Sequence, residues 1–232
     1  MGRLLPSASR FSGHMPALGR YMFALANFRQ ERFMNERTLQ HSEKSKLQFI
    51  YARRSVRGYA RTPLDSATVQ TLLDAAVHAP TAIHEEPWAF AVVQDQALLQ
   101  RLSDLAKPIF VEEARHRNAQ GASHSFDHFT RPDFNIFHGA DTLVIICAKQ
   151  SGPFIVADCW LAAENLMLAA SALGLGSCVI GSAITALNIH KTKTELGIPD
   201  EYTAIAAIVV GVPSGETQAT TRKEPLILSW KK

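Results

Sequence analysis

The chain has 232 residues, of which 47% are hydrophobic, and a formal net charge of +3 at pH 7. This length and apolar content suffice for one large domain with a full core. The net charge is small and the cations are not interleaved with aromatic residues. The composition therefore argues against nucleic-acid binding as the main activity and favours small-molecule chemistry.

The first 42 residues differ in composition from the rest. Four arginines precede the first acidic residue, Glu31, in a stretch that also contains serines. This pattern is typical of a transit peptide for organellar import, and it equally fits an over-long translation start with Met34 as the natural beginning. We expect residues 1–42 to form an extension that is disordered or targeting-like, and residues 43–232 to form the folded domain.

Apolar periodicity after this extension predicts an irregular succession of helices and strands. Asp65 or Ser66 is expected to cap a helix that runs through His78 and stops at Pro80. The other predicted elements are a helix at 43–53, a strand at 87–93, a helix after Asp95, an irregular cover at 107–138, a strand at 142–148, a helix at 154–173, a strand at 177–180, a helix at 187–196 and a strand at 203–212. Long helices around strands without a βαβ repeat predict a three-layer α/β/α sandwich of the α+β class, with a mixed central sheet.

Residues 165–190 contain no charged side chain, and that length exceeds the roughly 20 apolar residues that cross a bilayer. Glycines and polar residues divide the stretch into a helix, a turn and a strand, which is the pattern of a buried core segment. We therefore expect no membrane partner. Three cysteines, Cys147, Cys159 and Cys178, lie in apolar segments without a CxxC pair, which favours buried reduced thiols in a cytoplasmic protein.

The densest group of functional side chains is the run Arg53-Arg54-Ser55-Val56-Arg57. Guanidinium groups match phosphate and carbonyl oxygens, although a solvated helix end is the alternative interpretation of such a cluster. The sequence contains no Gly-x-Ser-x-Gly elbow and no dinucleotide-binding glycine motif, and the histidines between 116 and 138 match no compact metal motif. The pattern therefore favours a bound organic cofactor and no metal.

Four segments in order resemble the FMN-dependent nitroreductase family. They are RRSVRGY at 53–59, APTAIHEEPW at 79–88, the stretch at 158–180 that contains AAENLMLAASALGLG, and the closing LGIPDEY and IVVGVP with the tail RKEPL at 222–226. Together they cover roughly residues 45–230. The resemblance implies a homodimer with FMN bound between the subunits.

The resemblance also implies an activity in which NAD(P)H reduces the flavin, which then reduces an electron-poor small molecule such as a nitroaromatic, quinone or enone. The FMN phosphate would be held by Arg53 with Arg222 or Lys223, while Arg54 and Ser55 would contact the ribityl chain or the ring edge. No side chain would itself be catalytic, because the flavin carries the chemistry.

By the same resemblance, Arg57 would lie near the pyrimidine end of the flavin and favour the negative charge of the reduced ring. The residues expected to approach from the partner subunit are Pro80, Thr81, Ala82 and His84, and those whose backbone would face the ring are Val179, Ile180 and Gly181. The chain departs from the family pattern at His84 and Glu86, where the family has amides, and at Thr221, where a cation is expected. His84 and Glu86 could instead form a structural pair. These departures leave two alternatives, an FMN store or sensor with little turnover and a dimeric scaffold without flavin.

Overall fold

The structure is a computed structural model that describes residues 46–117, 128–149 and 152–232. The chain divides into two units, residues 1–48 and residues 49–232, and the fold below is that of the second unit. The predicted extension at 1–42 lies outside the described residues, so its boundary remains a prediction.

The core of the fold is a four-stranded sheet with the order β1-β2-β4-β3. Its strands are β1 (Trp88–Val93), β2 (Thr142–Lys149), β3 (Gly176–Val179) and β4 (Tyr202–Gly211), and all three pairings are antiparallel. Parallel pairing enters at the β3 edge, where Ser55 forms an isolated bridge with Ser177. The strands predicted from hydrophobicity are therefore confirmed, each within two residues at either end.

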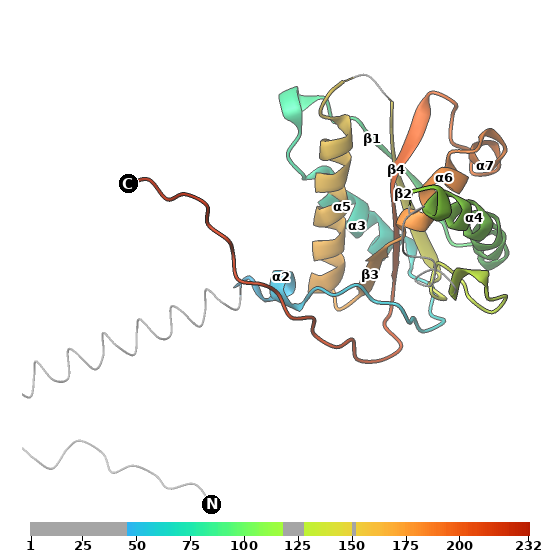
Figure 1. The fold of residues 1–232 in the computed structure, drawn as a ribbon, viewed down its shortest axis with the longest axis horizontal. Coiled ribbons are helices and arrows are strands. Elements are labelled where there is room, and N and C mark those ends of the chain that lie inside the picture. Colours follow the sequence, from blue (N-terminus) through green and yellow to red (C-terminus); the bar gives the residue numbers. More distant parts are fainter. Residues whose placement is uncertain (1–45, 118–127, 150–151) are drawn as a thin grey trace, which may run out of the picture. The chain divides into compact units, whose positions relative to one another are not determined.

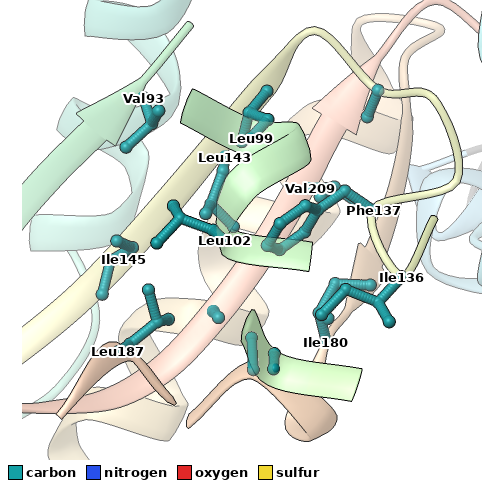
Figure 2. Close-up of a cluster of buried hydrophobic side chains, with 14 of the residues drawn as sticks. Val93, Leu99, Leu102, Ile136, Phe137, Leu143, Ile145, Ile180, Leu187 and Val209 are labelled. Carbon is teal, nitrogen blue, oxygen red and sulfur yellow. The ribbon is translucent and has the colours of Figure 1, made fainter. Parts of the chain in front are cut away.

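Helices cover both faces of the sheet, as the three-layer prediction requires (Figure 1). On one face α3 (Ser66–Val77) and α5 (Ile155–Ala172) pack against alternate residues of the central strands, such as Val144 and Ile208. On the other face α4 (Gln96–Arg117) and α6 (Ile184–Leu187) pack against the intervening residues. Figure 2 shows this second core, in which Leu143 lies beside Leu99 and Leu102, and Leu187 lies beside Ile145.

The predicted start of α3 is confirmed at Asp65. Its Oδ1 accepts a hydrogen bond from the Thr68 backbone N–H at 2.6 Å, which satisfies one of the unpaired donors of the first turn. Leu72 and Ala76 are fully buried on the inner face of the helix. The helix ends at Val77, three residues before Pro80.

The irregular cover predicted from residue 107 is wrong for its first part, because α4 continues through Pro108 to Arg117. Proline removes one backbone hydrogen bond and normally breaks a helix at a cost of about 3 kcal/mol. Here the buried stripe of Leu102 and Ala106 resumes at Ala114 on the far side of Pro108, so packing against the sheet holds the helix together. Residues 118–127 lie outside the described part, and residues 128–138 have the predicted irregular backbone.

The predicted helix at 187–196 is instead two short helices, α6 and α7 (His190–Glu195). The interruption occurs at Asn188, whose side chain bonds to β4 instead of facing solvent. Its Oδ1 accepts from the Ala204 N–H at 2.8 Å, and its Nδ2 donates to the Ala204 carbonyl at 3.0 Å. The next residue, Ile189, is therefore extended, with φ −67° and ψ 132°.

Among the described residues, α5 is the one helix long and apolar enough, by length and composition, to cross a membrane. Eight of its residues are buried against the sheet and neighbouring helices, including Ala162 and Leu166 with no exposed surface. Its opposite side leaves Val156, Trp160 and Leu161 at least 40% exposed. The helix is thus a core element with one uncovered apolar side.

Candidate functional site

The arginine run lies along the free edge of the sheet as an added extended segment. Val56 N–H donates to the Ser177 carbonyl at 3.0 Å, and Ala60 N–H donates to Val212 at 2.8 Å. Val56 and Tyr59 are buried, and the Tyr59 hydroxyl donates to the Val56 carbonyl at 2.9 Å. Two apolar anchors therefore fix the backbone on either side of Arg57.

Two glycines make room for these anchors. A Cβ built on Gly176 would lie 2.7 Å from Val56 Cγ2, and one on Gly211 would lie 3.1 Å from the Tyr59 ring. A distance of 2.7 Å is shorter than a Cβ shows to non-bonded atoms in real structures, so the position of the Val56 side chain depends on glycine at position 176.

Arg57 lines a cavity of about 480 Å³ on the α4 side of this edge. The cavity lining consists of Arg57, Phe110, His128, Phe129, Phe134, Ile136, His138, Cys178, Val179, Ile180, Gly181 and Ser182. No carboxylate belongs to this lining, and within the described part of the chain Arg57 forms no ion pair. The cavity therefore combines flat apolar walls with uncompensated positive charge, which suits an aromatic group that carries or acquires negative charge.

Arg53 and Arg54 line a second, smaller cavity of about 240 Å³ beside the C-terminal end of α5. Arg53 Nε lies 3.4 Å from Glu164 Oε1 on α5. The Arg54 guanidinium donates to the Tyr51 and Arg53 carbonyls at 2.5 and 2.8 Å. One short run thus supplies cations to two cavities, because the residues on either side of buried Val56 diverge.

The aromatic wall of the larger cavity comes from residues 128–138. The Phe134 ring is perpendicular to the His128 ring, with their centroids 5.0 Å apart, and meets the His138 ring edge-on at 6.0 Å. The Phe129 ring lies 5.2 Å from Phe134. The aromatics of this segment were expected to line a pocket lid or to fill the edge of the core, and the structure places Phe129 and Phe134 in the cavity wall. The position of the segment in this wall comes from tertiary packing alone.

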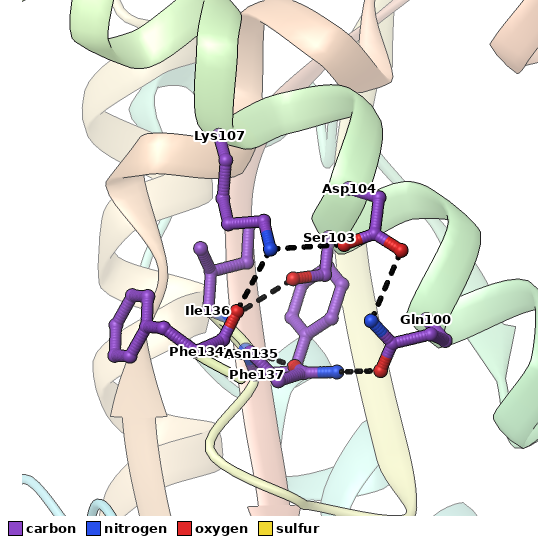
Figure 3. Close-up of polar contacts among 8 residues, drawn as sticks. All are labelled: Gln100, Ser103, Asp104, Lys107, Phe134, Asn135, Ile136 and Phe137. Atoms are coloured by element: carbon purple, nitrogen blue, oxygen red, sulfur yellow. Dashed lines mark hydrogen bonds and ion pairs between the residues drawn. The ribbon is translucent and has the colours of Figure 1, made fainter. Parts of the chain in front are cut away.

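A polar network on α4 holds this wall in place (Figure 3). Lys107 Nζ donates to the Phe134 carbonyl at 3.0 Å and pairs with Asp104 Oδ1 at 2.9 Å. Ser103 Oγ accepts from the Ile136 N–H at 3.1 Å, and it is completely buried. Ile136 and its neighbour Phe137 belong to the core in Figure 2, so this part of the wall is continuous with the core.

The loop between α3 and β1 contains the other predicted flavin contacts, Pro80 to His84. Ile83, His84 and Glu86 all have positive φ, near 50°, which is strained for residues other than glycine. None of the loop residues lines either cavity, and no contact joins His84 to Glu86, both exposed, within the described structure. Within its described residues, the single chain therefore shows no His84–Glu86 pair, and residues 83–86 of the loop are exposed.

Sequence reasoning missed Asp158, a buried carboxylate in the first turn of α5. Both of its oxygens lie 3.3 Å from the Ala82 backbone N–H, so it anchors the strained loop. An acidic residue in the otherwise apolar first turn of the helix was the signal that could have indicated it.

The basic tail is not brought to the cavities. Arg222 and Lys223 lie in the exposed segment after β4, where Arg222 donates to the Thr220 hydroxyl at 3.0 Å. Their proposed phosphate role stays a prediction. The three cysteines are buried and free, as expected, and burial raises the pKa of the Cys147 and Cys159 thiols to about 11. The thiols are therefore neutral at physiological pH.

Comparison with known proteins places this chain in a family. The Nitroreductase family profile matches residues 50–212, well over half of the chain, so the chain belongs to the nitroreductase family. An Archaeoglobus fulgidus protein named "Putative NADH dehydrogenase/NAD(P)H nitroreductase" is 29% identical over 175 residues, 73% of this chain and 86% of that protein. The iodotyrosine deiodinase of Thermotoga neapolitana is 23% identical over 75% of this chain and 92% of its own length.

A solved structure agrees with this assignment. The nitroreductase with bound FMN from Bacteroides fragilis superposes with a TM-score of 0.68 at 27% identity, covering 80% of this chain and 98% of that one. The predicted α+β nitroreductase-like fold and the family resemblance are therefore confirmed.

Proposed function

We propose that the protein is an FMN-dependent oxidoreductase that accepts electrons from NAD(P)H and passes them to a small electron-poor molecule. The observation that carries this proposal is the cavity of about 480 Å³ with Arg57 and without a lining carboxylate. When bound there, FMN would supply the electron-accepting ring, and the protein would bind and orient it. Membership of the nitroreductase family and the FMN and NAD(P)H in relatives' names support this choice.

The residues present fit a flavin ring in three ways. Gly181 has open space where a Cβ would lie, so a planar group can approach the backbone of Val179 to Gly181 closely. Phe110 and Phe134 add flat apolar walls. Arg57 places a permanent cation where reduction of the ring would add negative charge, and such a preplaced charge favours the reduced form.

The smaller cavity suits the phosphate end of the same molecule. Arg53 and Arg54 line it together with Ser177 and Thr217. In the sequence, Ser55 lies between Arg54, which lines the smaller cavity, and Arg57, which lines the larger one. The Arg53–Glu164 pair is partly exposed, so exchanging that partner for a phosphate costs little. Arg222 or Lys223 would join the phosphate when the tail is ordered.

The uncovered side of α5 supports a homodimer as part of this proposal. Val156, Trp160 and Leu161 form an exposed apolar stripe on a helix whose other side is core. The tail adds Leu226, Leu228 and Trp230, each at least 72% exposed. A second copy would cover this surface, and its loop from Pro80 to His84 would reach the flavin.

Trp160→Glu is expected to convert the dimer to monomers and to lower FMN affinity at least tenfold. A carboxylate in an apolar interface loses hydration without a partner, at a cost of a few kcal/mol. The measurement is sedimentation velocity with parallel fluorescence titration of FMN. Glu201→Gln, an exposed change at the start of β4, is the matched control. If the Trp160→Glu variant remained dimeric, α5 would not be part of the dimer interface.

The proposed activity is tested by an anaerobic titration of the purified protein. We expect the protein to be yellow or to take up added FMN, and the flavin absorbance to be bleached by NADH or NADPH. A panel of nitroaromatic, quinone, enone and iodophenol acceptors then restores the absorbance and ranks the acceptors; the iodophenol is included because of the deiodinase relative. FMN that binds but is not bleached would favour the store or sensor, and failure to bind FMN would leave only the scaffold.

A further inference from the structure

His138 has a strained backbone that the surrounding contacts impose. Its φ is 57° and that of the following Gly139 is 77°, so two consecutive residues are left-handed. This conformation costs a non-glycine residue about 1–2 kcal/mol. His138 N–H donates to the Asn135 carbonyl at 3.0 Å, and the Phe137 N–H donates to Asn135 Oδ1 at 2.8 Å. Strain that neighbouring contacts enforce at a cavity wall is typical of a functional position.

The turn that holds His138 is itself fixed to α4. The Asn135 side-chain amide donates to Gln100 Oε1 at 2.8 Å, and Lys107 and Ser103 bind the backbone of Phe134 and Ile136 (Figure 3). The imidazole is therefore presented to the cavity by a rigid support.

The charged and titratable groups in the cavity lining around His138 include no carboxylate. From the edge segment comes Arg57, from the turn at 128–130 comes His128, and from β3 comes Cys178, whose pKa is raised by burial so that it stays a neutral thiol. Lys107 on α4 is already bonded to Asp104 and to the Phe134 carbonyl. Among these groups, none is an anion directed into the cavity.

This environment keeps the imidazole neutral at physiological pH. Burial, then Arg57, then His128 hold the pKa of His138 below its ordinary value of 6.5. An anion introduced into the cavity has the opposite effect, because it stabilises the imidazolium and raises the pKa. The cavity is therefore arranged so that His138 gains a proton when negative charge arrives.

We propose that His138 faces the flavin and takes up one proton from solvent when the flavin is reduced, and returns it to solvent when the flavin is reoxidised. This inference rests on the proposed function. NAD(P)H would supply a hydride, that is, two electrons and one proton, and the reduced flavin would pass these to the acceptor, which takes one further proton from solvent. The proton on His138 is additional to these and is exchanged with solvent alone. Arg57 then supplies a fixed charge, and His138 a charge that appears only with reduction.

The test compares the pH dependence of the flavin midpoint potential in the wild type, His138→Asn and His116→Asn. Asparagine tolerates a left-handed backbone and does not titrate, so the first variant removes only the titration. His116 is exposed on α4, outside the cavity lining, and serves as the control. The potential is measured anaerobically against reference dyes between pH 5.5 and 9, with FMN saturating.

Uptake of one extra proton per two electrons changes the equilibrium constant of reduction by a further factor of ten for each pH unit. For a two-electron couple this corresponds to about 30 mV per unit. We expect the midpoint potential of the wild type and of His116→Asn to fall with pH more steeply than that of His138→Asn, by about 30 mV per pH unit. This difference should begin below pH 6.5, and the slopes should become equal at high pH. Parallel curves in all three proteins with FMN bound would overturn the inference and leave the proposed function intact. A protein that binds no FMN would overturn both. Thermal melts check that His138→Asn is folded, and 15N shifts of the His138 ring in the oxidised and reduced wild type give the same answer without a variant.

Discussion

The Arg57→Gln variant is expected to reduce its flavin about 100-fold more slowly than the wild type, the magnitude typical for removing one preplaced electrostatic donor. The oxidised ring is neutral, and the charge that Arg57 would stabilise develops only as electrons arrive. FMN affinity should fall by about tenfold, the lower end of the range for one lost hydrogen bond from a charged donor, because the oxidised ring carries no charge. The measurement is stopped-flow loss of flavin absorbance after anaerobic mixing with NAD(P)H, beside a fluorescence titration of FMN.

Arg61→Gln is the matched control for Arg57→Gln. It removes the same charge four residues away, at an exposed position outside the cavity lining. We expect wild-type reduction rates for this control. If Arg57→Gln only lowered FMN occupancy, with an unchanged rate for the bound flavin, the electrostatic role of Arg57 would be wrong.

Gly176→Ala is expected to lower the free energy of unfolding by about 2 kcal/mol or more, the typical cost of overpacking a core. The added Cβ would lie 2.7 to 2.9 Å from three atoms of buried Val56, and Val56 cannot move without shifting the backbone of the arginine run. The melting temperature should fall by about 4–8 °C for a chain of this size. FMN affinity should fall with it, since Arg54 and Arg57 flank Val56.

Gly215→Ala is the control for Gly176→Ala, because no atom lies within 4 Å of its added Cβ. Its melting temperature should match the wild type in differential scanning calorimetry. A Gly176→Ala protein with wild-type stability would mean that Val56 is not seated as described. Arg57→Gln should keep the wild-type melting temperature, so the two predictions separate a lost charge from a displaced segment.

Local sequence signals predicted the elements whose ends depend on nearby residues. The Asp65 cap of α3 and the strands β2 and β4 follow from side chains within a few positions of each boundary. The extension of α4 past Pro108 did not follow, since the packing of Ala106 and Ala114 outweighs the local penalty. The break at Asn188 did not follow either, because its partner is Ala204 on β4.

The candidate site shows the same division. Arg57, Val179, Ile180 and Gly181 were predicted as neighbours of one ligand, and the structure brings all four to one cavity. A cover over a pocket was predicted at 107–138, but the place of His128 and His138 in its wall was not, because it depends on the contacts of residues 134–137 with α4. The anchor from Asp158 to Ala82 joins residues 76 positions apart, and no local pattern encodes it.

A crystal structure of the purified protein with FMN tests the central claim most directly. We predict the flavin ring in the cavity between the backbone of 179–181 and the aromatic wall, with the guanidinium of Arg57 at the pyrimidine edge and the phosphate beside Arg53. Density for FMN elsewhere, or an Arg57 side chain turned to solvent beside a bound flavin, would contradict the account.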